Sequence, residues 1–378
     1  MIPCYILSLP DRKDRETLQK DLIKIILEIR HMPEIKGGFN NYFLGWEFLF
    51  QVIQKDIKAM CQDEDFINTT AFNKPLRNNL VTVIACVSTN IPCEIYGKPG
   101  TSKTLSSNIA KKYLGQGKGD QSTVILNSLP GMITQYYCGS QSSKAEEIES
   151  LFSRANEKAA SLIEEARQKE GVHNIKDLHL KDMSTILFDE FGLLSFSPFH
   201  PNKAMHSKLD NIESEKNKVS FIAISNYTTD ASLANRMISV YQPDLDQDDL
   251  QQTIRAIFLT LKDGDKLRFC NSITGSLAKA YISFRKKQEA EWYHPNFHGT
   301  RDFYQMIKYI RVELDKIKPR EDGPVGAEAM MRRDILEVVN WAIKKNFSGC
   351  MYRDKGGKEL ITSHTYFTQC FIEDLEKG

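Results

Sequence analysis

The sequence predicts an α/β fold, in which helices flank a parallel sheet, followed by a helical domain. Three observations predict it. A glycine-rich loop at residues 97–104 joins a short apolar run to a helical segment. Two later apolar runs, 184–188 and 219–225, are each followed by polar side chains, as is typical of buried parallel strands. From residue 244 onward, apolar residues recur every three or four positions, as in amphipathic helices.

The length and composition indicate a globular chain of two or three domains. The 378 residues are 41% hydrophobic and 26% charged, and the net charge of +1 argues against a broad footprint for nucleic acid or an anionic membrane. No apolar run is long enough to span a bilayer. The eight cysteines form no CxxC pair, which disfavours a zinc finger and favours reduced thiols in a cytoplasmic protein.

We expect an N-terminal helical extension over residues 1–72, an α/β nucleotide-binding domain over 73–243 and a helical lid domain over 244–378. In the extension, apolar residues at positions 18, 22, 25 and 26 form one helical stripe. An aromatic-rich stretch over 43–53 is expected to pack against a neighbouring domain. A helix over 76–86 leads into the strand before the loop.

The loop at 97–104 has the layout of a phosphate-binding P-loop, with a strand before it and a helix after it. Its glycines allow the backbone N–H groups to surround an anion, and the helix adds the positive end of its dipole. Lys103 is expected to reach the β- and γ-phosphates, and the Thr104 hydroxyl to hold Mg²⁺. Ser102 stands where the pattern GxxxxGK[ST] has its last glycine. The alternative is a Gly-Pro turn that happens to start a helix. The predicted binding residues are Gly97, Lys98, Pro99, Gly100, Thr101, Ser102, Lys103 and Thr104.

Between the loop and the next acidic motif, the pattern predicts a turn, a strand and a long helix. Residues 115–120 form the turn and residues 122–126 the strand, which ends in a second turn at 127–131. Ser143 and Glu146 have the spacing of a capping box, so a helix is expected to begin there, with apolar positions 148, 151, 152 and 155 on one face.

Two acidic residues follow the apolar run at 184–188. Ligands of open α/β sheets bind at the carboxyl ends of the strands, which places Asp189 beside the Mg²⁺ and Glu190 where it can polarise a water. A carboxylate suits both tasks, as a hard oxygen ligand and as a base. An Asp-Glu pair often just begins a loop, but its position after a P-loop favours a Walker B motif.

Asn226 follows the third apolar run, and its amide could hold the attacking water or touch the γ-phosphate. A turn-forming Asn is the alternative, and the two earlier motifs favour the functional interpretation. Arg236 precedes a short apolar segment over 237–241. It could point into a neighbouring module's nucleotide as an arginine finger, or be an ordinary surface arginine.

In the C-terminal part, the pattern of apolar residues predicts helices over 248–258, 277–282, 300–307 and 335–343. Arg301 lies in the first turn of its helix, where a cation is unfavourable for the dipole, so we expect it to reach the nucleotide instead. His294 and His298 have metal-ligand spacing, but Pro295 lies between them and no acidic partner is evident, so a metal site is disfavoured.

These elements occur in the order of an AAA+ P-loop ATPase, and the loop resembles the GPPGTGKT form of that superfamily. More narrowly, the chain resembles the AAA+ modules of mysterin, the giant RING-finger E3 ubiquitin ligase. The resemblance covers most of the chain, with weaker likeness near residues 8–10. It is carried by GKPGTSKTLS at Gly97, ILFDEFGLLSFSP at Ile186, FIAISNYTTDASLANR at Phe221, GTRDFYQMIKYI at Gly299 and KKNFSG at Lys344. Mysterin-like modules also carry Ser before the loop lysine, so Ser102 is a mark of this family.

The resemblance implies a five-stranded parallel sheet with a helical lid, and it implies roles for individual residues. It implies Lys103 and Thr104 as Walker A, Asp189 and Glu190 as Walker B, Asn226 as sensor 1, Arg301 as sensor 2 and Arg236 as the arginine finger. It also implies ATP and Mg²⁺ as cofactors, with other AAA+ modules or subunits and ubiquitin machinery as partners. The ligase parts of mysterin lie outside its ATPase modules, so the chain is expected to be a fragment or a reduced member of the family.

The sequence thus favours an ATPase that couples hydrolysis of Mg·ATP to motion within a larger assembly. A second hypothesis is a module that binds ATP without turnover, as a regulatory or scaffold part of a ubiquitin ligase. A P-loop kinase or GTPase is a weaker third hypothesis, since the sequence lacks an NKxD guanine motif and its helical C-terminal part fits a lid better.

Overall fold

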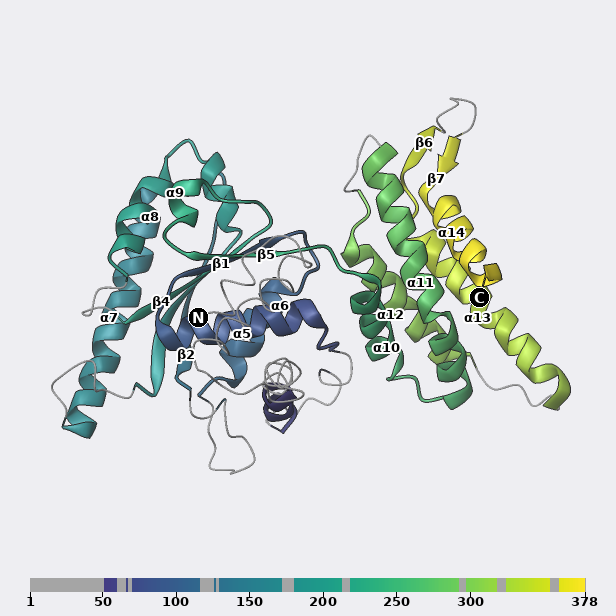
Figure 1. Cartoon of the computed structure of the whole chain (residues 1–378), viewed down its shortest axis with the longest axis horizontal. Coiled ribbons are helices and arrows are strands. Elements are labelled where there is room, and N and C mark those ends of the chain that lie inside the picture. Colours follow the sequence, from purple (N-terminus) through teal and green to yellow (C-terminus); the bar gives the residue numbers. More distant parts are fainter. Residues whose placement is uncertain are drawn as a thin grey trace, which may run out of the picture. The chain divides into compact units, whose positions relative to one another are not determined.

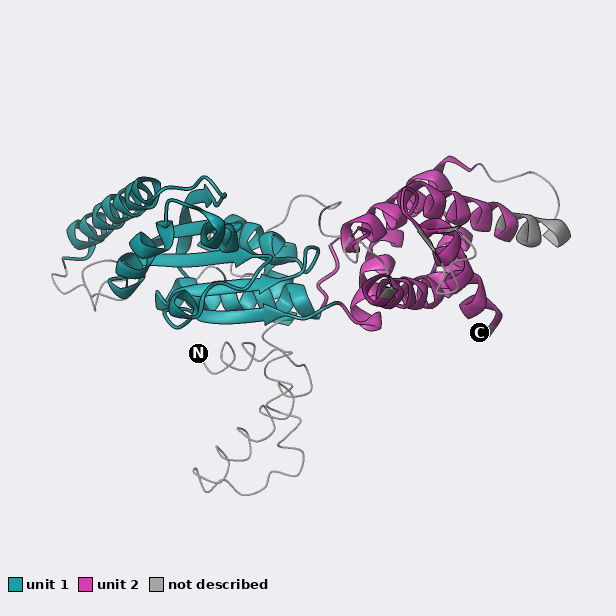
Figure 2. Cartoon of the chain, turned by 90° about the horizontal axis from the view of Figure 1, so that it is seen from above, with its two compact units in different colours: residues 1–62, 74–244 teal, residues 63–73, 245–378 magenta. Residues whose placement is uncertain are grey.

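The computed structural model describes residues 51–59, 66, 70–115, 126, 129–171, 180–212, 218–291, 297–317, 324–353 and 360–377. The chain divides into two compact units, residues 1–62 with 74–244 and residues 63–73 with 245–378 (Figure 2). Of the expected N-terminal extension, residues 51–59 are helical, with Ile53 and Ile57 buried. The predicted helix around residues 18–26 lies outside the described residues.

A five-stranded sheet forms the centre of the first unit (Figure 1). Its strands are β1 (Cys93–Gly97), β2 (Gly131–Cys138), β3 (Asp182–Asp189), β4 (Val219–Ser225) and β5 (Ile238–Gln242). They lie in the order β2-β3-β4-β1-β5, and every neighbouring pair is parallel. The expected parallel five-stranded sheet is therefore confirmed. Because all strands run in one direction, the loops that follow β1, β3 and β4 leave the same edge of the sheet.

The strand β2 was not predicted from the sequence. We expected a strand at 122–126, but residues 122–125 lie outside the described residues and Leu126 is in a turn. The described strand β2 spans residues 131–138, and only its first two residues are buried. It is an edge strand of the described sheet, where burial is incomplete, so its sequence shows no alternation of apolar and polar residues.

Helices cover both faces of the sheet. On one face, α5 (Lys74–Thr89) packs on β1 and β4, and α6 (Lys103–Tyr113) packs on α5 and β2. On the other face, α7 (Ala145–Glu170) packs on β3 and on α8 (Pro201–Asp210), near the short helices η2 (Phe191–Phe196) and α9 (Ala231–Ala234). Phe152, Phe188, Phe191 and Phe221 contact one another in this second layer. Their packing fixes η2 against the ends of β3 and β4.

Helix α7 begins one residue later than the predicted capping box implies. Its N-cap is Lys144, whose backbone N–H donates to Glu147 Oε2 at 3.2 Å. The Ser143 hydroxyl instead accepts the Ser140 N–H at 3.0 Å and the Tyr137 hydroxyl proton at 2.9 Å. The predicted pair of Ser143 and Glu146 is therefore wrong, because Ser143 is engaged by the strand end and the carboxylate at the third helical position is Glu147. The predicted apolar face is confirmed, since positions 148, 151, 152 and 155 are buried.

The second unit is mainly helical, as expected. Its helices are α10 (Gln247–Phe258), α11 (Gly264–Glu291), α12 (Thr300–Lys316), α13 (Pro324–Asn346) and α14 (Ser363–Lys377). Their core includes Phe284, Phe303, Phe347 and Phe367, all fully buried. A small antiparallel hairpin of β6 (Met351–Arg353) and β7 (Leu360–Thr362) was not predicted. Both strands span three residues, which is too short for a periodic signal.

His298 is a core residue of this second unit. It is buried, its Nε2 lies 3.1 Å from Ser363 Oγ, and burial lowers its pKa. In the described part of the chain, no helix has both the length and the apolar character needed to cross a membrane.

Candidate functional site

The loop between β1 and α6 wraps closely because two of its residues are glycines. Gly97 and Gly100 have backbone φ values of +150° and +91°, which residues other than glycine rarely adopt. A Cβ at Gly97 would also lie 2.5 Å from the backbone oxygen of Gln242 on β5. The loop therefore needs glycine at position 97 both for its conformation and for its close approach to the neighbouring strand.

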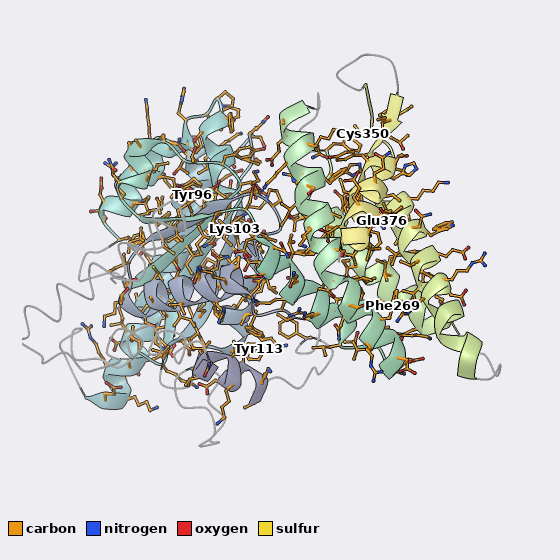
Figure 3. All side chains as sticks on the ribbon, turned by 45° about the vertical axis from the view of Figure 1, so that its right-hand side comes forward. Tyr96, Lys103, Tyr113, Phe269, Cys350 and Glu376 are labelled. Carbon is orange, nitrogen blue, oxygen red and sulfur yellow. The ribbon has the colours of Figure 1, made fainter. Side chains whose placement is uncertain are left out.

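Lys103 lies at the start of α6 within the first unit (Figure 3), and its side chain points into the loop. Only 5% of the residue is exposed. Its Nζ donates to the backbone oxygens of Gly97 and Lys98 at 2.6 and 2.9 Å, and lies 3.4 Å from Thr101 Oγ1. The loop thus holds an ammonium group at its centre, where an anion enclosed by the loop would meet it.

Thr104 is exposed in the first turn of α6. The N–H groups of a first helical turn have no partner within the helix and carry the positive end of the dipole. Asn79, a fully buried residue of α5, donates from Nδ2 to the Thr101 backbone oxygen at 2.9 Å. Sequence reasoning missed this support, because an Asn inside a helix gives no signal of its partner.

Ser102 has a left-handed backbone, with φ of +60° and ψ of +21°. This geometry explains why the general pattern has glycine there, since an L-residue with a side chain is strained in that region. We expect Ser102→Gly to stabilise the first unit by about 1 kcal/mol, measured as the free energy of unfolding in urea. The same substitution at Ser153, an exposed position inside α7, should instead destabilise the chain. Equal effects at both positions would contradict the strain at Ser102.

Asp189 ends β3 and is partly exposed at the carboxyl edge of the sheet. Its Oδ1 accepts the Glu190 backbone N–H at 2.9 Å, and the Tyr136 hydroxyl lies 3.5 Å from its Oδ2. Burial, with the Asp189 carboxylate as a smaller cause, raises the pKa of Tyr136 to about 12. Tyr136 is on β2, so it could not be associated with this site before that strand was known.

Glu190 and Asn226 lie side by side, although they follow different strands. The Asn226 amide nitrogen donates to both oxygens of Glu190, at 3.1 and 3.2 Å. Glu190 has a left-handed backbone with φ of +51°, which turns its side chain out of the path of β3. The residues that follow β3 and β4 therefore meet, and the Glu190 carboxylate is hydrogen-bonded to the Asn226 amide at the carboxyl ends of the strands.

Arg236 lies two residues before β5, at the amino-terminal ends of the strands, whereas the loop follows the carboxyl end of β1. Its Nε donates to Asp210 Oδ1 at 2.7 Å, and its Nη1 donates to the Ser232 backbone oxygen. The loop follows the other end of β1, about 13 Å along the strand direction from the level at which β5 begins. An arginine finger role for Arg236 therefore stays a prediction, and would act on the nucleotide of a neighbouring module.

Arg301 is exposed in the first turn of α12, in the second unit. Gly299 is the N-cap of this helix, and its backbone N–H donates to Asp302 Oδ2 at 2.8 Å. The predicted helix start is confirmed. The sensor 2 role of Arg301 stays a prediction.

Glu94 is a buried carboxylic acid on β1 that the sequence analysis treated as part of an apolar run. Only 1% of the residue is exposed. Its Oε2 accepts the Thr229 hydroxyl at 2.9 Å and lies 3.4 Å from Ser239 Oγ, while Oε1 has no hydrogen-bond partner among the described residues. Burial raises its pKa from 4.5 to about 7, with Asp230 adding to the shift and the two hydroxyls opposing it.

Comparison with known proteins identifies the class of this domain. Residues 69–249 match the family model described as the RNF213 AAA domain. Together with the strand order β2-β3-β4-β1-β5 and the loop after β1, this match makes the fold that of an AAA+ P-loop domain.

The human E3 ubiquitin-protein ligase RNF213 is 28% identical over 289 residues, which is 74% of this chain and 5% of that protein. The zebrafish (Danio rerio) E3 ubiquitin-protein ligase rnf213-beta is 28% identical over 332 residues, which is 84% of this chain and 6% of that protein. Residues 69–249 are therefore similar to the AAA domain of RNF213 proteins, as the resemblance to mysterin AAA+ modules implies. The chain spans only a small part of the length of these relatives.

Solved structures with similar chains include Trip13 proteins. A chain of the E. coli MS115-1 HORMA:CdnC:Trip13 complex has 13% identity and a TM-score of 0.41, with 82% of this chain and 92% of that chain covered. Rhizobiales Trip13 has 14% identity and a TM-score of 0.36, with 80% and 95% covered.

Proposed function

We propose that this chain is an ATPase that binds Mg·ATP at the loop after β1 and hydrolyses it. The observation that carries the proposal is the meeting of Glu190 and Asn226 at the sheet edge from which the Lys103 loop also leaves. A phosphate-binding loop alone fits any anion ligand. A carboxylate and an amide beside it add the groups that orient and deprotonate a water.

In this proposal, the loop and α6 hold the phosphates. Lys103 exchanges its contacts with the loop oxygens for contacts with β- and γ-phosphate oxygens, which are stronger because they are charge-assisted. The backbone N–H groups at the start of α6 add to this anion site. Binding of ATP therefore needs no new charge in the loop, only a change of partners for one ammonium group.

The residues present fit Mg²⁺. The donor set consists of the exposed Thr104 hydroxyl and the partly exposed Asp189 carboxylate, and hard oxygen donors of this kind are what Mg²⁺ prefers. The Glu190 N–H and the Tyr136 hydroxyl orient the carboxylate. When bound, Mg²⁺ would neutralise charge on the β- and γ-phosphates.

Glu190 is the proposed base and Asn226 its partner. The Asn226 amide nitrogen lies at similar distances from both oxygens of Glu190, so a single N–H is shared between them and acceptor sites remain on the carboxylate for a water. The amide nitrogen has a second hydrogen, which can be donated to the γ-phosphate or to the water. The pair would thus align the water with the phosphorus while Glu190 takes its proton.

The ATPase is proposed to act within a larger assembly. The relatives that carry this module are named as E3 ubiquitin-protein ligases, so a role in ubiquitin transfer is proposed for a protein that contains it. Other AAA+ modules are the proposed neighbours, because Arg236 lies far from its own loop and could serve another nucleotide.

A second function, binding of ATP without turnover, is favoured by the same hydrogen bonds. With both oxygens of Glu190 engaged by Asn226, the carboxylate has fewer acceptor sites left for an attacking water. In that case the module would hold ATP as a regulatory ligand.

Binding of a fluorescent ATP analogue and release of phosphate, measured on the wild-type chain and on Lys103→Met, test the proposal. We expect the wild type to bind and hydrolyse ATP in the presence of Mg²⁺. Lys103→Met should weaken binding at least about tenfold, because the ammonium at the centre of the loop is lost. Tight binding without phosphate release, even with neighbouring modules supplied, would select the second function.

Lys111→Met is the matched control, since Lys111 is an exposed residue of the same helix. It makes the same change in charge and side chain away from the loop. Equal loss of binding in the two variants would contradict the assignment of the loop.

A further inference from the structure

Ser225, the last residue of β4, connects the two strand tips that carry Glu190 and Asn226. Only 1% of the residue is exposed. Its Oγ accepts the Gly192 backbone N–H at 3.1 Å and the Tyr227 backbone N–H at 3.0 Å, and its hydroxyl donates to the Tyr227 backbone oxygen. One donor and two acceptor sites are all that a hydroxyl offers, so this side chain is fully engaged.

Gly192 provides the space for this contact. A Cβ at position 192 would lie 2.5 Å from Ser225 Oγ and 3.1 Å from Tyr227 Cβ. Its φ is outside the left-handed region, so alanine could adopt the backbone. Glycine is therefore required here by the approach of the Ser225 hydroxyl and not by the conformation of the chain.

These contacts lie directly beside the proposed catalytic pair. Gly192 is two residues after Glu190, and Ser225 is one residue before Asn226. We propose that the Ser225–Gly192 contact is a clamp that positions Glu190 against Asn226, so that Ser225 is a positioning residue for the hydrolysis of ATP. The expected effect of Ser225 on turnover rests on the proposed ATPase function. The expected effect of Ser225 on the position of Glu190 relative to Asn226 rests on the hydrogen bonds alone.

A second close approach supports the idea that the Glu190 backbone is held from both sides. A Cβ at Gly139, after β2, would lie 2.7 Å from the Glu190 backbone oxygen, and the Gly139 N–H donates to the Asp189 backbone oxygen at 2.8 Å. Phe191 is buried against Phe188 and Phe221. The backbone that carries the Glu190 carboxylate is therefore closely packed, and the Ser225–Gly192 contact fixes its position relative to the end of β4.

The test compares Ser225→Ala, Gly192→Ala and the double variant in the full chain. Three quantities are measured: the turnover number for ATP, the dissociation constant of a fluorescent ATP analogue, and the side-chain amide resonances of Asn226, assigned with Asn226→Asp. Glu190→Ala gives the position of those resonances when the contact with Glu190 is lost. Gly275→Ala is the matched control, because a Cβ there meets only Gln251 Nε2, at 3.6 Å.

We expect Ser225→Ala to lower turnover by about 10- to 100-fold, as small misplacements of reacting groups do, with the affinity for nucleotide nearly unchanged. The Asn226 resonances should move toward their position in Glu190→Ala. In the double variant the methyl group at 192 no longer meets a hydroxyl oxygen, so its melting temperature should exceed that of Gly192→Ala alone. The control should leave turnover and resonances unchanged.

The readouts separate the two proposals. Unmoved Asn226 resonances in Ser225→Ala would overturn the clamp, whatever the turnover. A wild type without turnover, but with Asn226 resonances that move in Ser225→Ala, would overturn the ATPase and leave the clamp standing. Equal losses of nucleotide affinity and turnover would mean that Ser225 supports the whole site and does not position Glu190.

Discussion

Replacing Glu190 by glutamine is expected to lower the rate of ATP hydrolysis by about 100- to 1,000-fold while leaving the affinity for ATP nearly unchanged. Glutamine has the shape of glutamate and can still accept a hydrogen bond from Asn226 through its amide oxygen. It cannot take a proton from water. The loss should therefore fall on turnover, measured as phosphate release at saturating Mg·ATP, and not on binding, measured with a fluorescent ATP analogue.

Glu149→Gln is the control for this substitution, because Glu149 is an exposed residue of α7. It makes the same change of charge on the same unit and should hydrolyse ATP at the wild-type rate. Turnover in Glu190→Gln equal to that of the control would show that Glu190 is not the base. A loss of binding together with turnover would indicate that Glu190 supports the loop instead.

Replacing Glu94 by glutamine is expected to stabilise the chain at pH 8 by about 3 kcal/mol and to leave it unchanged near pH 4. Burial raises the pKa of Glu94 from 4.5 to about 7 in the folded state, so folding favours the protonated acid. The stability that this proton provides is complete below pH 4.5 and is lost as the pH rises to about 7. Above that pH the folded chain holds a buried charge whose Oε1 has no partner among the described residues.

Glutamine mimics the protonated acid at every pH, so the variant should lack this dependence. The free energy of unfolding in urea, measured for both proteins from pH 4 to pH 8, gives the difference directly, since other titrating groups cancel. Glu157→Gln, at an exposed position of α7, should keep the wild-type profile. Parallel profiles for wild type and Glu94→Gln would contradict a protonated Glu94.

The parts of the site that the sequence predicted are those whose chemistry is local. The loop at 97–104 is read from glycines and a lysine within eight residues, and the turn at Ser102 follows from the same pattern. Asp189 and Asn226 each end an apolar run, and parallel strands bring such ends to one edge. The contact between Asn226 and Glu190, the residue after Asp189, could therefore be expected before the strands were seen.

The parts that the sequence missed depend on partners far along the chain. Glu94 lies within an apolar run, and nothing nearby shows that Thr229 and Ser239 surround it. Asn79 and Ser225 act through single hydrogen bonds to backbone atoms of other segments. Periodicity detects buried faces and not such bonds, and for the same reason the partly buried strand β2 at residues 131–138 was missed.

The length of strand β4 determines where Asn226 lies relative to the ends of the two neighbouring strands. All seven of its residues are buried, and it pairs with β1 on one side and with β3 on the other. Adding or removing one residue within it would move Asn226 by about 3.3 Å relative to both neighbours and turn its side chain to the opposite face. The position of Asn226 relative to the phosphate loop and to the acidic tip of β3 is therefore set by the length of a fully buried strand, so changes of length should be tolerated here far less than changes of side chain.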